Sequence, residues 1–366
     1  MIRVLHIINS ADHGGISTML LNYYRYVDRT QVAFDVAVSV DSVGHDGREM
    51  EKLGATLYYL PIKSKNYRLH VDTLREILKN GSYDAIHVHS ALTSWVDMRV
   101  AKKCGVRVRV AHAHNADKSK RSFKEGLKRR VGIILMKRYA TARLACSKDA
   151  AVYTFGARSL RHPTVHILPN AIECEAFRFS AAARAEVREE LGLSPDAFVL
   201  GTVGRMTAEK NQIRLVRLMP ELLKRRPEAR LLLVGDGKCR PAIEAQAQAL
   251  QIADKVVFTG GRSDVARLLC AMDVFALPSL QEGFGIAALE AAAAGLPVIL
   301  SDVIPRELEL IPQHAFASLE APLFAWAEQI CAFTPTDRAA GVEAVVAAGY
   351  DISSAAAALE RIYFEK

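Results

Sequence analysis

The chain has 366 residues, more than one hydrophobic core usually holds, so we expect two domains. Half of the residues are hydrophobic and 24% are charged, as in a typical globular protein, and no apolar run is long enough to span a bilayer. The net charge of +8 favours an anionic partner, such as a phosphate, a nucleic acid or an acidic membrane surface.

The cysteines and the first residues indicate the compartment. The six cysteines are scattered and form no C-x-x-C pair, so we expect reduced thiols in a cytosolic protein, without disulfides or a zinc site. The first ten residues, MIRVLHIINS, carry one charge and no small-residue cleavage site. They predict a β-strand and not a signal peptide.

Apolar runs alternate with amphipathic stretches through the first half of the chain. We expect strands over residues 3–8, 34–40, 56–60, 85–89, 106–111, 142–146 and 166–168. Helical patterns lie between most of them, over residues 17–27, 48–53, 71–79, 94–103 and 123–139.

The same rhythm continues in the second half. Strands are expected over residues 198–203, 231–234, 255–258, 274–277 and 297–301, and helices over 213–225, 241–251, 264–271 and 285–294. This alternation predicts parallel sheets with helices on both faces. We therefore expect two Rossmann-like domains, 1–175 and 176–348. A last helical pattern, over 352–363, falls within a tail of residues 349–366.

In an open parallel sheet, ligands bind beyond the carboxyl ends of the strands, so residues that directly follow a strand are candidate site residues. After the first strand, Gly14 and Gly15 precede a helix start, where backbone amides can approach an anion. The segment lacks a G-x-G-x-x-G pattern, so a dinucleotide is not favoured. A simple tight turn is the alternative.

Two His-x-His pairs each end a strand: His87 with His89, and His112 with His114. Residues i and i+2 of a strand share a face, so each pair points one way at the carboxyl edge of the sheet. These histidines could bind sugar hydroxyls or phosphate in an active site. A four-histidine metal site is less favoured, because no carboxylate pattern supports it. Packing at a strand end is the alternative for any single histidine.

Two cations follow the strand over residues 198–203. Arg205 and Lys210 lie five residues apart on a loop that enters a helix. Arginine makes forked bonds to phosphate oxygens and lysine supplies a compact charge, so together they would neutralise a pyrophosphate. Two solvated surface charges are the alternative.

Residues 277–302, LPSLQEGFGIAALEAAAAGLPVILSD, read as an apolar helix between two buried strands, with two acids in it. Glu282 lies in the loop beside Gly283 and Gly285, where the amides of the helix start form an anion site. Glu290 lies about 8 to 12 Å further along the helix, roughly the distance from a hexose to the ribose of a nucleotide sugar. A buried carboxylate needs partners, and two ribose hydroxyls would serve. A charge on the helix dipole plus one structural acid is the alternative.

These residues resemble a known family. The segment from Glu282 to Glu290 is similar to the E-x7-E motif of GT-B glycosyltransferases, specifically retaining family 4. Residues 204–211, GRMTAEKN, resemble that family's GR…KN loop, and residues 231–237, LLLVGDG, its strand and turn. The likeness covers essentially the whole chain, more closely in the second half. It is nearest to bacterial exopolysaccharide and capsule enzymes.

The resemblance implies a GT-B fold: two Rossmann-like domains facing each other across a cleft, with the C-terminal helix crossing back onto the first. It also implies a donor site in the second domain, in which Arg205 and Lys210 hold the pyrophosphate and Glu290 the ribose. Glu282 would bind the donor sugar and distal phosphate, together with backbone amides. The remaining residues implied in donor binding are Gly283, Phe284 and Gly285, which supply those amides, and Arg262, near the base.

In the first domain, the resemblance implies that His114 is the active-site histidine, with His112 as the second choice. Gly15 would approach the phosphate or the acceptor. The other candidates on the acceptor side are Gly14, His87 and His89. No metal or other cofactor is implied.

The implied reaction transfers a hexose or N-acetylhexosamine from a nucleotide sugar to a hydroxyl, with anomeric retention. A UDP-sugar is the favoured donor and GDP-mannose the second choice, and the acceptor is a glycan or a polyprenyl-diphosphate-linked sugar. The alternatives are a sugar-nucleotide epimerase with the same architecture and a non-catalytic scaffold that binds nucleotide sugar. No recognition motif supports a nucleic-acid partner.

The basic segment 118–138, KSKRSFKEGLKRRVGIILMKR, bears on the acceptor and the location. Its apolar residues recur at helical spacing among lysines and arginines, which suits a helix lying on an anionic membrane. We therefore expect a cytoplasmic protein at the inner face of the membrane. An ordinary helix with its apolar face in the core is the alternative. The apolar positions are Phe123, Leu127, Val131, Ile134 and Leu135.

Overall fold

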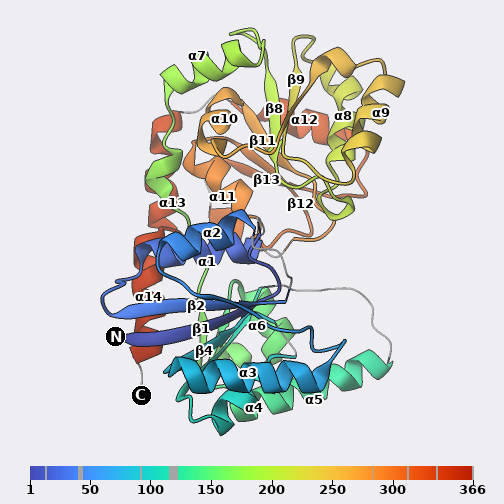
Figure 1. Ribbon diagram of the computed structural model, residues 1–366. Helices are drawn as coiled ribbons and strands as arrows, with labels where there is room; N and C mark the ends of the chain where they lie inside the picture. The colour runs from blue at the N-terminus through green and yellow to red at the C-terminus, as the bar shows by residue number, and fades with distance from the viewer. Residues whose placement is uncertain are drawn as a thin grey trace. The chain divides into compact units, whose positions relative to one another are not determined.

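The computed structural model describes residues 1–12, 15–39, 44–90, 93–114, 123–282, 284–310, 313–334 and 337–364. The chain divides into two compact units. The first contains residues 1–171 and 352–366, and the second contains residues 172–351. Each unit has one sheet with helices on both faces, which confirms the predicted class (Figure 1).

The first unit is built on a seven-stranded sheet in the order β3-β2-β1-β4-β5-β6-β7, and all of its pairs are parallel. Buried apolar runs form the central strands, as expected for a sheet covered on both sides, whereas the edge strands β3 and β7 are partly exposed. Their bounds are β1 (Ile2–Ile8), β2 (Val32–Val38), β3 (Leu57–Tyr59), β4 (Ala85–Val88), β5 (Val108–Ala113), β6 (Ala142–Ala145) and β7 (Val165–Ile167).

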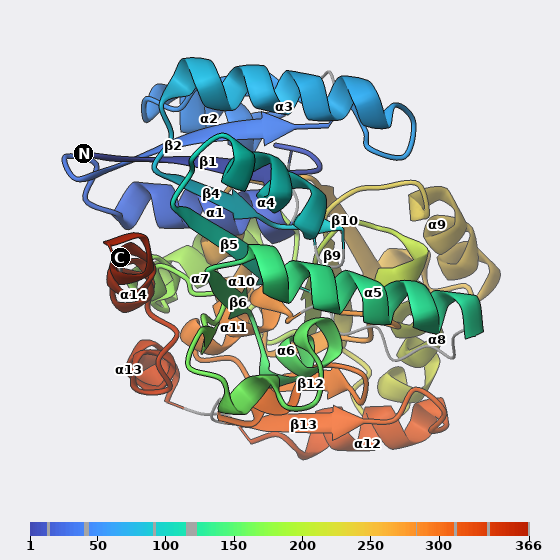
Figure 2. The ribbon, with the colours of Figure 1, turned by 90° about the horizontal axis from the view of Figure 1, so that it is seen from below.

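Helices bury an apolar core on each face of this sheet. One face packs against α1 (Gly15–Tyr26), α2 (His45–Lys52) and α14 (Ile352–Phe364). Figure 2 views the unit from the other face, which is covered by α3 (Tyr67–Gly81), α4 (Ser94–Lys103), α5 (Phe123–Tyr139) and α6 (Lys148–Phe155). A 3-10 helix, η1 (Ser159–Arg161), follows α6.

The second unit has a six-stranded parallel sheet in the order β10-β9-β8-β11-β12-β13. Its strands are β8 (Val199–Val203), β9 (Arg230–Val234), β10 (Val256–Gly260), β11 (Val274–Leu277), β12 (Val298–Ser301) and β13 (His314–Ala317). We did not predict β13. It is a short edge strand with mixed polarity and partial burial, so it carries little of the periodic signal of the central strands.

Helices again cover both faces of this second sheet. One core includes α8 (Gln212–Leu223), α9 (Arg240–Ala249) and α12 (Leu323–Ala332), and the other includes α7 (Ala181–Glu190), α10 (Val265–Ala271), α11 (Ile286–Ala293) and α13 (Gly341–Ala347). Short 3-10 helices connect these elements: η2 (Cys174–Phe177), η3 (Ala208–Lys210), η4 (Ala253–Lys255), η5 (Arg306–Leu310) and η6 (Arg338–Ala340).

The strand order reverses once in each sheet, between β1 and β4 in the first unit and between β8 and β11 in the second. Loops that leave two such strands at their carboxyl ends diverge to opposite faces, which opens a crevice where α/β proteins bind ligands. The topology therefore selects the loops after β1, β4, β8 and β11 as the places to look for a site.

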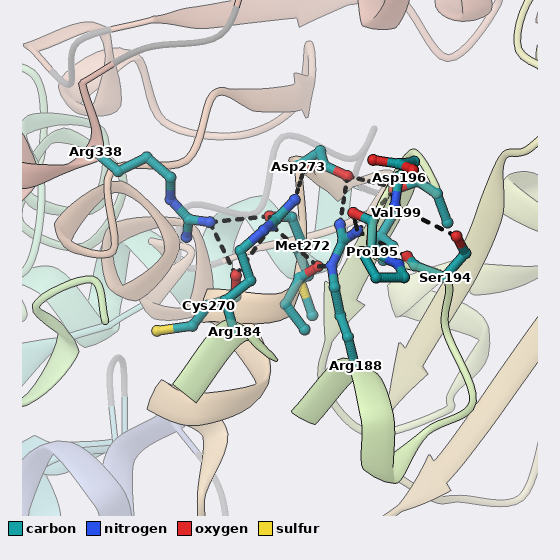
Figure 3. A network of polar contacts seen from close by, with 12 residues as sticks. Arg184, Arg188, Ser194, Pro195, Asp196, Val199, Cys270, Met272, Asp273 and Arg338 are labelled. Atoms are coloured by element: carbon teal, nitrogen blue, oxygen red, sulfur yellow. Dashed lines mark hydrogen bonds and ion pairs between the residues drawn. The ribbon is translucent and has the colours of Figure 1, made fainter. Parts of the chain in front are cut away.

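Three arginines converge at the opposite, amino end of β11 (Figure 3). Asp273 accepts hydrogen bonds from Arg184 at 2.6 Å and from Arg188 at 2.8 Å. Arg338 donates to backbone carbonyls at the end of α10, which have no partner within the helix. Burial lowers the pKa of Arg338 to about 10. These donors are used by the protein itself, so the network holds α7 and α10 to the sheet.

The last helix of the chain belongs to the first unit. Leu359 and Tyr363 of α14 are buried in the core that also contains residues of α1 and β2. The observed units change over at residues 171–172 and 351–352, a few residues from the expected limits at 175 and 348. In the part of the chain that the structure describes, no helix is long and apolar enough to cross a membrane.

Candidate functional site

The loops after β8 and β11 meet at the switch point of the second sheet. Lys210 Nζ lies 2.5 Å from Glu282 Oε2, which also accepts a hydrogen bond from the Ser279 hydroxyl at 3.3 Å. The Leu280 amide donates to the Glu209 carbonyl at 2.7 Å, which ties the two loops together. A cation from one predicted motif and a carboxylate from the other thus form an ion pair at the edge where a ligand is expected.

Arg205 lies on the same loop as Lys210, but its side chain is exposed and makes no ion pair with any residue that the structure describes. The loop itself is held rigidly. The Gly204 amide donates to the Val234 carbonyl at 2.9 Å, and the Gly204 carbonyl lies so close to Gly235 that a Cβ there would be 2.1 Å from its oxygen. Only glycine at 235, with φ of +131°, permits this approach. Arg205 is therefore a free cation on a fixed backbone.

Helix α11 begins beside this ion pair. Gly285, at φ +98°, turns the chain into the helix, and the first amides of α11 lack intrahelical partners. Phe284 is buried, with its ring 5.5 Å from that of Tyr350, so only its backbone can face a ligand. Gly283 lies outside the described residues. The start of α11 thus offers amide donors for an anion.

Glu290 lies one turn from the end of α11 and is partly buried. Burial raises the pKa of its carboxyl group to about 7. No cation pairs with it within the described residues. Burying a carboxylate without a counter-charge costs free energy, and hydroxyl groups of a bound ligand can offset this cost by donating hydrogen bonds to it. Glu290 is therefore a candidate for binding the hydroxyl groups of a ligand.

Arg262, which follows β10, is already occupied. Its guanidinium group makes two bonds of 2.7 Å to Asp264 and one of 2.7 Å to Glu190. This forked pairing leaves the side chain little capacity for another ligand. A contact from this position to a nucleotide base would have to come from the backbone.

The four predicted histidines of the first unit gather near its switch point. His87 and His89 on β4 and its end lie beside His112 and His114 on β5 and its end, and all four are buried. His89 Nδ1 and His114 Nε2 are 2.8 Å apart, and His87 Nε2 and His112 Nδ1 are 3.1 Å apart. The two predicted pairs thus form one cluster.

The cluster contains a fifth histidine that the sequence analysis missed. His6 lies in the middle of β1 opposite His87, and its Nδ1 is 3.0 Å from His89 Nε2. In each of two sets of three histidines, one ring nitrogen of each residue lies within 4.8 Å of those of the other two. The sets are His6, His87 and His89, and His89, His112 and His114. The sequence carried no local signal for His6, because only the strand register brings it to the others.

The glycine turn after β1 is described only in part. Gly15 opens α1 and is exposed, and no atom lies within 4 Å of the position that a Cβ would take. Gly14 lies outside the described residues. Ser279 is a further addition to the predicted site. Its position three residues before Glu282, at the end of a strand, is the signal that could have indicated it.

Comparison with models of protein families identifies the family of the chain that carries these two switch points. The model described as Glycosyl transferases group 1 matches residues 183–320, and the model described as Glycosyltransferase Family 4 matches residues 13–176. EpsF of Bacillus subtilis (strain 168), which carries the name of a glycosyltransferase, is 33% identical over 99% of this chain and 96% of its own length. The chain belongs to glycosyltransferase family 4.

Other relatives of this family 4 glycosyltransferase carry more specific names. The UDP-Gal:alpha-D-GlcNAc-diphosphoundecaprenol alpha-1,3-galactosyltransferase of Escherichia coli is 28% identical over 67% of this chain and 66% of its own length. Among solved structures, HepE of Anabaena in complex with UDP has a TM-score of 0.80 at 20% identity and 99% coverage of both chains. WaaG, a glycosyltransferase involved in lipopolysaccharide biosynthesis, has a TM-score of 0.73 at 19% identity, over 99% of this chain and all of its own. These likenesses show that this family 4 glycosyltransferase has the GT-B fold.

Proposed function

We propose that the protein transfers a hexose or N-acetylhexosamine from a nucleotide sugar to a hydroxyl of a glycan or lipid-linked acceptor, with retention and without a metal ion. A UDP-sugar is the favoured donor. The Lys210–Glu282 ion pair beside the unpaired Arg205 carries this proposal, because it combines two cations for a diphosphate with a carboxylate for sugar hydroxyls. Named relatives that use UDP-Gal and GDP-mannose agree with a donor of this class.

Each residue has a role in this reaction. Arg205 and Lys210 bind the pyrophosphate, and the amides at the start of α11 share its negative charge. Glu290 accepts hydrogen bonds from the ribose hydroxyls, and Glu282 accepts them from the transferred sugar. His114, at the end of β5 in the first unit, is the candidate in that unit for a hydrogen bond to the sugar.

The chemical step breaks the bond between the anomeric carbon and the diphosphate oxygen. The acceptor oxygen attacks the same face of the sugar, and its proton passes to the departing phosphate. Negative charge develops on the diphosphate, so Arg205 and Lys210 stabilise the transition state more than the ground state. In this proposal these two cations supply the charge that a divalent ion provides in other transferases.

A donor panel tests the function. The purified protein is incubated with UDP-, GDP- and ADP-sugars, with and without EDTA, and thermal shift and nucleotide release are recorded. We expect one UDP-sugar to stabilise the protein and to be hydrolysed slowly at a rate that EDTA does not change. Loss of activity in EDTA would refute metal independence. Conversion of the sugar without release of UDP would support an epimerase, and binding without any turnover would support a scaffold.

We also propose that α5 binds the anionic lipid surface at the inner face of the cell membrane, where a polyprenyl-linked acceptor would lie. Its residues Leu127, Val131 and Ile134 are 55%, 47% and 66% exposed. The alternative that this apolar side belongs to the core is wrong for these three residues. Met136, on the other side of the helix, is fully buried and anchors it to the unit.

Basic side chains surround the exposed apolar side of α5. Apolar side chains that enter the acyl region, with lysines and arginines that meet anionic headgroups, are typical of peripheral membrane helices. The exposed basic residues described on this helix are Lys128, Arg130, Lys137 and Arg138. The lysines and arginine at 118, 120 and 121 lie outside the described residues.

Ile134→Asp tests this surface. We expect the wild-type protein to sediment with vesicles that contain phosphatidylglycerol and to remain free of vesicles of phosphatidylcholine alone. Ile134→Asp should lower the bound fraction about tenfold, because it loses apolar burial and adds a like charge. Leu69→Asp is the matched control, since Leu69 is 51% exposed on α3 of the same unit. Equal loss in both variants, or no binding by the wild type, would contradict the proposal.

A further inference from the structure

Five buried histidines and one tyrosine form a continuous hydrogen-bonded chain through the first unit. The register of β1, β4 and β5 places the histidines on one face of the sheet, and α14 adds the tyrosine from the helix layer that covers it. None of these side chains belongs to a residue more than 8% exposed. The six residues are His6, His87, His89, His112, His114 and Tyr363.

One arm of the chain leads to the carboxyl edge of the sheet. His6 Nδ1 contacts His89 Nε2 at 3.0 Å, and His89 Nδ1 contacts His114 Nε2 at 2.8 Å. His89 therefore uses both of its ring nitrogens within the chain. Among the described residues, His114, at the end of β5, uses Nε2 only, so Nδ1 is the nitrogen that it can offer to a ligand.

The other arm leads into the interior. His112 Nδ1 contacts His87 Nε2 at 3.1 Å, and His87 Nδ1 contacts the Tyr363 hydroxyl at 2.6 Å. The hydroxyl also lies 3.5 Å from His6 Nε2, which joins the two arms. The chain ends at His112 Nε2, a buried atom with no hydrogen-bond partner in the part of the structure that is described.

All five histidines are neutral at physiological pH. Burial lowers the pKa of each, to about 3 for His6 and His114. The contacts exclude adjacent charged rings, because two neighbouring imidazolium rings would place N–H groups against each other at 2.8 to 3.1 Å. A neutral ring that uses both nitrogens in the chain donates with one and accepts with the other.

Counting protons locates the free N–H group. A neutral imidazole carries one N–H and a phenol one O–H, so the six groups carry six protons. Five contacts join the groups and use five of these protons. The sixth proton therefore lies outside the contacts, on His112 Nε2, on a Tyr363 hydroxyl that accepts from both neighbours, or on His114 Nδ1.

Only the last position avoids a buried donor without a partner. A proton on His112 Nε2 would leave such a donor in the interior, whereas a bare lone pair there is less costly. A Tyr363 hydroxyl that accepted twice would likewise leave its own O–H unpaired. At His114 the proton lies at the strand end, where a ligand can accept it.

We propose that the histidine chain holds His114 as its Nδ1–H tautomer, with His89 as the positioning residue, so that His114 acts on the substrate only as a hydrogen-bond donor. The role of His114 at the substrate rests on the proposed function, whereas its tautomer does not. Because His89 Nδ1–H occupies the Nε2 lone pair, His114 is not a general base. Its N–H suits an oxygen of the sugar or the phosphate.

Nitrogen NMR of the full-length protein, with histidine labelled by 15N, reads the tautomer directly. Long-range 1H–15N correlations separate protonated from bare ring nitrogens, and the spectrum of His114→Asn assigns the signals of His114. We expect Nδ1 protonated and Nε2 bare. Protonated Nε2, an imidazolium, or shifts of a metal-bound ring that EDTA removes would each overturn the proposal. This NMR measurement requires no nucleotide-sugar donor, so its outcome does not depend on the outcome of the donor panel.

Two variants test His89 as the positioning residue. His89→Phe keeps a ring in the stack with His87 and His114 but removes both nitrogens. We expect Nε2–H to appear at His114 and kcat/KM for donor hydrolysis to fall about tenfold, the value of one hydrogen bond. Tyr363→Phe is the matched control, since it leaves the His6–His89–His114 arm intact. It should keep Nδ1–H at His114, with activity within about twofold. An unchanged tautomer in His89→Phe, or equal loss in both variants, would refute the proposal.

Discussion

We expect Lys210→Ala to lower kcat for sugar transfer by about 10²- to 10³-fold, which is the usual effect of removing one preorganised charge from a developing anion. Lys210 Nζ lies 2.5 Å from Glu282 at the switch point of the second sheet, so it is held in place before a donor arrives. Negative charge grows on the diphosphate only as the glycosidic bond breaks. The loss should therefore appear in kcat under saturating donor, measured by nucleotide release with the donor that the panel selects.

Glu282 provides the check on this interpretation. Lys210→Ala also leaves that carboxylate without its cation, and this alone could repel a diphosphate. The double variant Lys210→Ala/Glu282→Gln removes the repulsion, so its kcat should still lie well below that of Glu282→Gln alone if the charge of Lys210 stabilises the transition state. Lys224→Ala, an exposed lysine paired with Glu221, is the control and should be unchanged. A rise in KM with unaltered kcat would show that Lys210 only binds the ground state.

Glu290→Gln should weaken donor binding and at the same time stabilise the unliganded protein above neutral pH. Burial raises the pKa of Glu290 to about 7 from its ordinary value of 4.5. Between these values the folded protein holds a proton that the unfolded chain has released, so the free energy of unfolding falls as pH rises. Glutamine does not ionise. The variant should gain about 2 kcal/mol over wild type on going from pH 5 to pH 8.

Two measurements separate these effects. Thermal unfolding at pH 5 and pH 8 should show a gain for Glu290→Gln that is larger by about 5 °C at pH 8. The Kd for UDP at pH 8 should rise about 10- to 100-fold, because hydrogen bonds from ribose hydroxyls to a carboxylate are lost. Glu328→Gln, an exposed acid on α12, should change neither quantity. Unchanged UDP affinity would remove Glu290 from the donor site.

Much of the fold follows from the sequence because its signals are local. Runs such as residues 231–234 and 274–277 are apolar and bounded by turns, and they form the buried strands β9 and β11. The strand β13 was missed because it lies at an edge, where polar residues are tolerated. The exposed apolar side of α5 was also undecided, since the sequence shows which residues share a helix face but not what covers that face.

The candidate site divides in the same way. Arg205, Lys210, Glu282 and Glu290 could be named because each directly follows a strand or interrupts an apolar helix. Their pairing could not, since the contact of Lys210 with Glu282 depends on β8 and β11 being neighbours. His6 was missed for the same reason. It is an ordinary residue of β1 in the sequence and a member of the histidine chain only after β1 pairs with β4.

The return of α14 to the first unit sets the order in which a nascent chain can be completed on the ribosome. The first unit begins at residue 1 but lacks its last helix until residues 352–364 have been synthesised. Residues 172–351 form a continuous segment and can finish folding earlier. The usual N-terminal-first order is thereby reversed. Until residues 352–364 are synthesised, the apolar surface that α14 covers stays open, so we expect a chain that stops before residue 352 to bind a chaperone.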